Sequence, residues 1–115
     1  MPLTIAHEEH GKRPVLVLDG DLDLATAAQL ATVAMALIES GASDVIMDAG
    51  KLTFCDSSGL TVFVQVANRL AADGGRLAIA GPTPIVRQVL ELSGLIGSLV
   101  VVDSVSDALA ALEAA

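Results

Sequence analysis

Two adjacent serines between an aspartate and a glycine form the part of this sequence best suited to chemistry. The run Asp56-Ser57-Ser58-Gly59-Leu60 stands directly before residues with apolar side chains at helical spacing. Hydroxyls in the first turn of a helix lie beside unpaired backbone N–H groups and the positive end of the helix dipole. Because such a position stabilises a phosphoryl group, the segment is interpreted as a phosphoacceptor site at a strand-to-helix junction.

A purely structural role would use the same residues. Aspartate and serine are both favoured at helix N-termini, so Asp56 and one of the serines could serve only as caps. Capping and phosphorylation are compatible, and the residues alone leave both open. The neighbouring Cys55 cannot form an internal disulfide, since it is the one cysteine, and is interpreted as a small buried side chain.

Two other kinds of chemistry would use serine or aspartate residues of this chain. A hydrolase would need Ser57 as nucleophile and His7 or His10 as its base, but the Gly-x-Ser-x-Gly elbow of such enzymes is absent. A receiver phosphorylated on aspartate would hold Mg²⁺ with carboxylates near strand ends. The candidates for that role are Asp19, Asp21 and Asp48. Two opening strands with no helix between them argue against the receiver, and no catalytic residue is expected.

Composition limits the partners. With 115 residues, 53% of them hydrophobic, the chain is expected to form one domain over 1–115. A net charge of −8 repels nucleic acids and anionic lipids, and 2% aromatic content removes the stacking platforms that single-stranded nucleic acids need. Neither a membrane span nor a signal peptide is evident, so we expect a cytoplasmic protein. His7, His10 and Cys55 make a poor metal set, and no cofactor is expected.

An alternation of strands and helices must position the motif. Residues 3–8 and 15–19 are β-prone and flank a turn, which predicts a hairpin. Three later strands are predicted at 45–48, 77–80 and 99–102. Four helices are predicted, with their first residues or caps at Thr26, Ser57, Thr83 and Ser104. The order predicts an α/β fold, in which a mixed sheet opened by a hairpin carries about four helices.

Two arginines lie outside these motifs. Arg76 and Arg87 are both interpreted as solvated surface cations, because arginine side chains are mostly exposed. For Asp21 and Asp23, a solvated loop position and a contact with a partner are weighed equally, since short acidic residues also suit turns.

The serine motif resembles the phosphorylation motif of the STAS-domain anti-sigma factor antagonists. Residues 56–60 match that motif, and Gly20-Asp21-Leu22-Asp23 resembles the family's Gly-Glu-Leu-Asp segment with Asp21 in place of the common Glu. Further similar segments follow in the family's order: 26–27, 74–77, 84–87 and 90–95. The resemblance covers nearly the whole chain and implies the STAS fold.

The resemblance also implies a function. Ser57 would be the phosphoacceptor and Ser58 its unmodified neighbour. The unphosphorylated protein would bind an anti-sigma factor that is an ATP-dependent serine kinase and release the sigma factor, and phosphorylation of Ser57 would block that binding. A serine phosphatase of the PP2C type would reset the switch. The expected partner-binding residues are Asp21, Asp23, Asp56, Ser58 and Gly59. The alternative within the same fold is an accessory subunit of a stress-signalling or lipid-transport complex.

Overall fold

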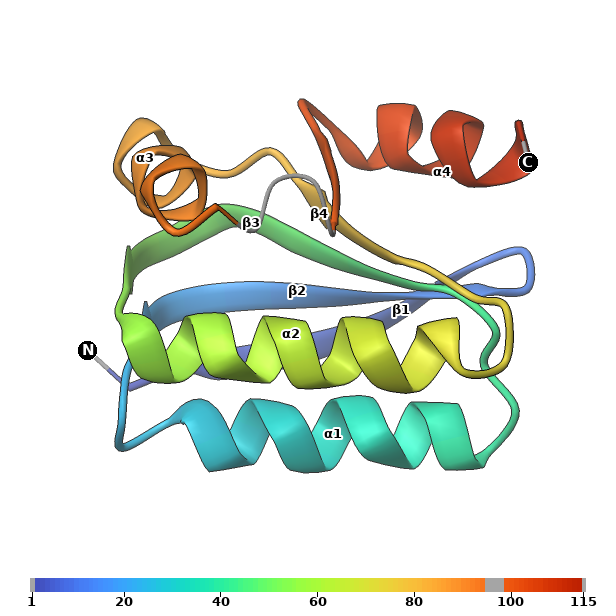
Figure 1. Cartoon of the computed structure of the whole chain (residues 1–115), viewed down its shortest axis with the longest axis horizontal. Coiled ribbons are helices and arrows are strands. Elements are labelled where there is room, and N and C mark those ends of the chain that lie inside the picture. Colours follow the sequence, from blue (N-terminus) through green and yellow to red (C-terminus); the bar gives the residue numbers. More distant parts are fainter. Residues whose placement is uncertain (1, 95–98, 115) are drawn as a thin grey trace.

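The protein is built on a mixed five-stranded sheet, seen in a computed structural model that describes residues 2–94 and 99–114 (Figure 1). The strands lie in chain order across the sheet. β1 pairs antiparallel with β2, and each later pair of neighbours is parallel. The strands are β1 (Thr4–His10), β2 (Arg13–Leu22), β3 (Val45–Cys55), β4 (Leu77–Ala80) and β5 (Val100–Val102). The predicted α/β fold with an opening hairpin is confirmed.

Helices lie on both sides of this sheet. Figure 1 shows α1 (Ala27–Glu39) and α2 (Ser57–Ala71) on one side, with α3 (Pro84–Leu92) and α4 (Val105–Glu113) on the other. Successive residues of the central strand β3 face opposite sides, so Met47 joins the larger core and Ile46 joins the smaller core beneath α4. Because both faces are covered, the start of β3 is apolar without alternation, as the sequence predicted.

Two strands extend further than the sequence predicted. β2 continues to Leu22 and β3 to Cys55, and the two residues are paired in register. The predicted ends at 19 and 48 were wrong because polar residues and glycines interrupt the apolar runs, whereas backbone pairing with register shifts continues the ladder. Asp21 therefore lies in a strand beside Phe54, rather than in a loop.

Thr26 is the N-cap residue of α1, as predicted, but its side chain does not cap the helix. Its hydroxyl donates to the carbonyl of Asp21 at 2.8 Å and accepts from the N–H of Asp23 at 3.0 Å. Gln29 donates its side-chain amide to the carbonyl of Leu3 at 3.0 Å. Both side chains therefore tie the connection between β2 and α1 to the sheet. The predicted caps of α3 and α4, Thr83 and Ser104, are confirmed.

Arg76 is not the solvated cation that the sequence predicted. Its guanidinium donates to the carbonyl of Leu112 at 2.7 Å, and Arg13 donates to the same carbonyl at 3.3 Å. Cations near the last carbonyls of a helix stabilise its C-terminus, so two arginines hold the end of α4. Arg87 pairs with Asp103 at the surface at 2.9 Å.

One further observation concerns membranes. Over the described residues, none of the helices combines the length and the apolar character needed to cross a bilayer.

Candidate functional site

The serine motif lies where β3 passes into α2, at the carboxyl ends of the parallel strands (Figure 1). The backbone N–H of Asp56 donates to the carbonyl of Leu22 at 3.2 Å, so the end of β2 is bonded to the start of the motif. The segment with Asp21 and Asp23 consequently adjoins the serines. The structure thus brings together the two segments that the sequence singled out.

Asp56 is the N-cap of α2. Its Oδ1 accepts from the N–H of Ser58 at 2.8 Å and from the N–H of Gly59 at 3.3 Å. The predicted capping role of Asp56 is confirmed, whereas neither serine side chain shares it. Within the described residues the Ser57 hydroxyl makes no hydrogen bond. Capping therefore leaves this hydroxyl available for another role.

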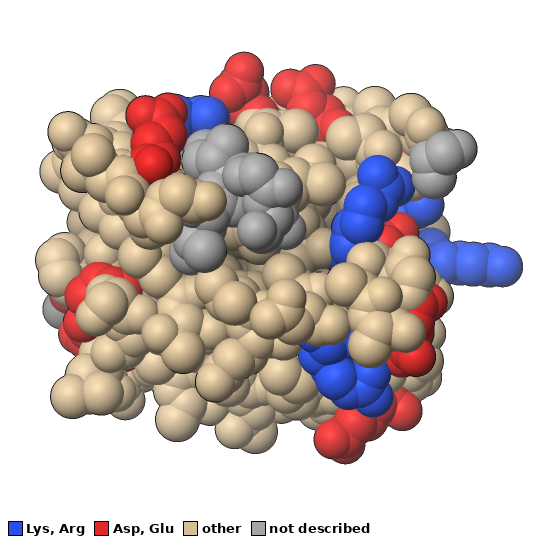
Figure 2. Space-filling view, viewed as in Figure 1, with Lys and Arg blue, Asp and Glu red and all other residues tan. Residues whose placement is uncertain are grey.

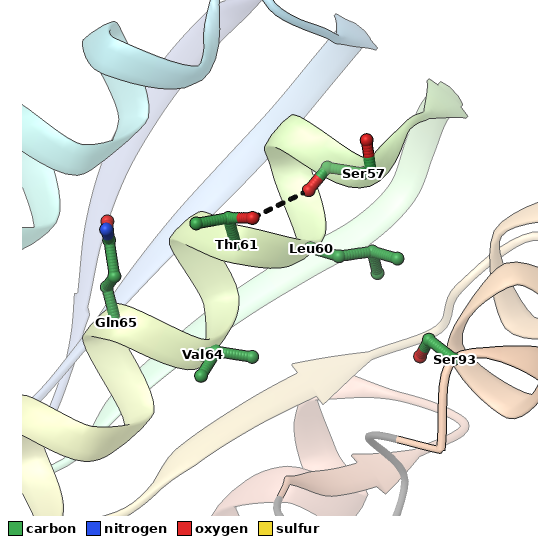
Figure 3. Close-up of a pocket in the computed structure, with 6 residues that line it drawn as sticks. All are labelled: Ser57, Leu60, Thr61, Val64, Gln65 and Ser93. Carbon is green, nitrogen blue, oxygen red and sulfur yellow. Dashed lines mark hydrogen bonds between the residues drawn. The ribbon is translucent and has the colours of Figure 1, made fainter.

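The two serines differ in their access to solvent. Ser57 is exposed and Ser58 is only half-buried. Figure 3 shows Ser57 at the first turn of α2, with its backbone carbonyl accepting a 2.9 Å hydrogen bond from Thr61. An enzyme that transfers a phosphoryl group must reach the acceptor oxygen directly, and that requirement favours Ser57 over Ser58.

Gly59 lets α2 approach the strand ends. A Cβ atom at this position would lie 2.6 Å from Cγ of Leu22 and 2.9 Å from Sγ of Cys55, closer than carbon atoms pack. The sequence pointed to Gly59 only as a partner contact. Its packing role depends on Leu22, which is distant along the chain, so no local pattern indicated it.

Cys55 is a buried thiol beneath this contact. Only 3% of the residue is exposed, and the thiol lies 3.6 Å from the carbonyl of Asp56. Burial, followed by the nearby charge of Asp56, raises the pKa of Cys55 to about 12. The thiol is therefore protonated at neutral pH and unsuited to nucleophilic chemistry.

Asp21 and Asp23 are both engaged in local hydrogen bonds. Thr53 on β3 donates its hydroxyl to Oδ1 of Asp21, at 2.6 Å, which links the ends of the two strands. Oδ1 of Asp23 accepts from the N–H groups of Ala25 and Thr26 at 3.0 and 3.2 Å and closes the turn into α1. Each carboxylate has a structural role, and each still adds negative charge beside the serines.

Sequence reasoning missed an apolar component of this end of the molecule. Phe54 is 46% exposed although it directly precedes the buried Cys55. Leu24, in the loop between β2 and α1, is 81% exposed. The sequence drew attention to polar residues alone, because apolar residues were assigned to the core. Leu24 could have indicated this surface from the sequence, because a leucine that lies between a predicted strand and a predicted helix belongs to neither core pattern.

The aspartates proposed for a receiver do not assemble into a metal site. Asp48 accepts from the N–H of Gly50 at 3.0 Å, and Asp19 is an exposed residue of β2. Among the residues placed by the structure, there is no group of three or more His, Cys, Asp or Glu side chains able to hold a metal ion.

Comparisons with known proteins agree on one family. The family model described as "Mlab, STAS domain" matches residues 5–112. A candidate anti-sigma factor antagonist of Bordetella bronchiseptica, BtrV, is 34% identical over 88% of this chain and 87% of its own length. The anti-sigma F factor antagonist of Paenibacillus polymyxa is 29% identical over 98% of this chain and 97% of its own.

Solved structures show the same fold. The Bacillus cell fate determinant SpoIIAA in its phosphorylated form is 27% identical to this chain, with a TM-score of 0.74 over 92% of this chain and 96% of its own. An anti-sigma factor antagonist from Mycobacterium paratuberculosis is 23% identical, with a TM-score of 0.89 over 96% of this chain and 94% of its own.

The cap is tested by replacing Asp56. In Asp56→Ala, two N–H groups lose their acceptor, and we expect the free energy of unfolding to fall by about 1 kcal/mol. Asp56→Asn should retain most of that stability, because its amide oxygen can accept the same bonds. Urea denaturation followed by circular dichroism measures both. Asp73→Ala, which removes an exposed pair with Arg69, should change stability by less than about 0.5 kcal/mol. An equal loss in Asp73→Ala would contradict the assignment.

The contact at Gly59 predicts that replacing this glycine by alanine destabilises the protein, whereas helix propensity alone predicts the reverse. An alanine inside a helix normally stabilises it by about 0.5–1 kcal/mol relative to glycine. In Gly59→Ala the methyl group would overlap Leu22, and we expect a net loss of about 1–3 kcal/mol. Thermal denaturation measures it. In a Leu22→Ala background the same substitution should cost less, because the nearest obstructing atoms are gone and only Cys55 Sγ remains close. A Gly59→Ala protein as stable as the wild type would refute the contact.

The raised pKa of Cys55 predicts slow alkylation. With a pKa of about 12 rather than 9, the folded protein holds roughly a thousandfold less thiolate at pH 8 than the unfolded chain. Iodoacetamide labelling followed by mass spectrometry should therefore be slow until denaturant is added. The contribution to stability is present below pH 9 and is lost as the pH rises towards 12, because the unfolded thiol ionises first. Cys55→Ala should remove that part of the pH dependence.

Proposed function

Because the chain belongs to the STAS-domain family of anti-sigma factor antagonists, we propose that it frees a sigma factor by binding the anti-sigma factor in its place. The observation that carries the proposal is the Ser57 hydroxyl at the start of α2, which is exposed beside the Asp56 cap and makes no hydrogen bond to any residue that the structure describes. The whole chain, 1–115, acts as one domain in the cytoplasm. It is a regulatory binding protein rather than an enzyme.

The unphosphorylated protein is the form that binds. Its partner is an anti-sigma factor of the histidine-kinase-like ATPase fold that acts as a serine kinase. The polar contacts come from the two segments joined at the strand ends. They are made by Asp21, Asp23, Asp56, Ser58 and Gly59.

Phosphorylation of Ser57 switches binding off. The Ser57 oxygen attacks the γ-phosphorus of ATP, an O–P bond forms, ADP leaves and the hydroxyl proton is released. The product carries about −1.5 to −2 charge on the Ser57 side chain. Two like charges about 5 Å apart repel by about 3 kcal/mol at an effective dielectric of about 20, or roughly a hundredfold in affinity.

The cap of α2 strengthens this effect. Asp56 already occupies the N–H groups of Ser58 and Gly59, so a phosphate on Ser57 cannot take these two donors without displacing the carboxylate. The phosphate therefore adds to the charge of Asp56 and is less neutralised than at an uncapped helix end. A partner surface that faces this turn meets two anionic groups together.

Resetting the switch requires hydrolysis of the phosphoserine. We assign that step to a serine phosphatase of the PP2C type, which would restore the binding form. The structure of SpoIIAA in its phosphorylated form supports the compatibility of this fold with phosphate. No refolding of the chain is needed for either step.

The switch is tested with purified candidate kinase anti-sigma factors from the source genome. After incubation with ATP, we expect mass spectrometry to find one phosphate, on Ser57, in the wild type and in Ser58→Ala, and none in Ser57→Ala. The phosphorylated wild type should bind the kinase roughly a hundredfold more weakly than the unmodified protein. Ser57→Ala should bind and stay bound in the presence of ATP.

The opposite outcomes are equally clear. Labelling of Ser57→Ala to the same extent as the wild type would remove Ser57 as the acceptor. Binding to a partner without any phosphate transfer would favour an accessory subunit of a stress-signalling or lipid-transport complex.

A further inference from the structure

The large hydrophobic residues that the structure leaves exposed lie on segments that follow the strands at the edge of the sheet that carries the serine motif. Among the described residues they are Leu24, Phe54, Ile85 and Leu92. Leu24 follows β2, Phe54 lies at the end of β3, and Ile85 lies in the segment after β4. The carboxyl ends of these parallel strands share one edge of the sheet. Ile85 in the first turn of α3 is 63% exposed, and Leu92 in its last turn is 81% exposed. Single exposed hydrophobics are ordinary, but a group around one site marks an interaction surface.

A cavity also lies beside Ser57, and its lining reaches the residue after Leu92. It has a volume of about 350 Å³ and lies between the outer face of α2 and the end of α3 (Figure 3). Leu60 and Val64 point into it from α2, and Ser93, the residue after Leu92, closes it from the other side. Ser57 forms one end of the cavity. The phosphoacceptor therefore stands at the edge of a mainly apolar hollow.

Charge is unevenly distributed around this surface. Four of the chain's six cationic residues lie towards the opposite end of the strands and of α2, where blue atoms gather in Figure 2. These are Lys12, Arg13, Arg69 and Arg76. The end with the serines carries the carboxylates of Asp21, Asp23 and Asp56. The other two cations are Lys51 on β3 and Arg87 on α3, and Arg87 is paired with Asp103. A complementary partner presents apolar side chains bordered by Lys and Arg.

We propose that this apolar surface, formed by Leu24, Phe54, Ile85, Leu92 and the cavity, supplies most of the affinity for the anti-sigma factor. The inference rests on the proposed function and adds the chemistry of the partner, an apolar segment with a basic border that inserts between α2 and α3. A second copy of this chain fits poorly, because it would bring two acidic ends together at a net charge of −8 each.

The same arrangement explains why phosphate on Ser57 would act so strongly. A phosphoryl group at the edge of the cavity would have to lose water when the apolar segment of the partner entered, and an unpaired buried charge is costly. The polar residues at the strand ends then determine orientation and the response to phosphate, whereas the apolar residues hold the complex together.

The test uses Ile85→Ser and Leu92→Ser, whose exposed side chains can be shortened without opening the core. The matched control is Ala110→Ser, at an exposed position on α4. Affinity for the kinase anti-sigma factor that labels the wild type is measured by isothermal titration calorimetry, and folding by thermal denaturation. We expect both test variants to bind at least about tenfold more weakly, the control to bind within about twofold, and all melting temperatures to agree within a few degrees. Affinity should also fall with rising salt, as opposite charges require.

The outcomes separate the two proposals. If the wild type binds and is labelled on Ser57 while Ile85→Ser and Leu92→Ser bind equally well, the docking surface is wrong and the switch stands. If no kinase binds or labels the wild type, the switch fails and the docking surface fails with it. If sedimentation shows a dimer of the wild type that both variants abolish, a second copy covers the surface and the proposed partner is wrong.

Discussion

The close contact between the first turn of α2 and the ends of β2 and β3 is the constraint on which the site depends. Gly59 has no side chain, so the helix can press against Leu22 and Cys55. The N–H of Asp56 is bonded to the carbonyl of Leu22, and its carboxylate caps the helix. These contacts hold the serines at a defined place at the sheet edge. A larger residue at position 59 would have to displace the side chains of Leu22 and Cys55 or the start of the helix.

Rigid positioning of the motif is suited to a switch that works by charge. Ser57 faces solvent and Ser58 is half-buried, because the helix turns the second serine towards the strands. A carboxylate that already uses two of the free N–H groups leaves a new phosphate less neutralised than at an ordinary helix end. The structural cap and the proposed switch are thus two consequences of one hydrogen-bonding arrangement.

The two ends of the sheet are specialised in different ways. At one end, Arg13 and Arg76 hold the C-terminus of α4 through the carbonyl of Leu112, and that contact stabilises the smaller core. At the other end, the sheet edge with Ser57 carries the carboxylates of Asp21, Asp23 and Asp56 and the exposed side chains of Leu24 and Phe54. The contacts that hold the site use backbone groups and buried side chains, so the exposed apolar surface stays available for a partner.

The sequence by itself determined the order of strands and helices, the caps at Thr83 and Ser104, and the motif at 56–60, because these depend on neighbouring residues. Local pattern could not show that β2 and β3 continue to Leu22 and Cys55, since pairing between distant strands carries the ladder across interrupting polar residues and glycines. The packing of distant segments determines which serine is exposed, why glycine fits position 59 without displacing Leu22, and which apolar residues remain outside the core. Each of these depends on atoms brought together from distant parts of the chain, and a local pattern contains no information about such contacts.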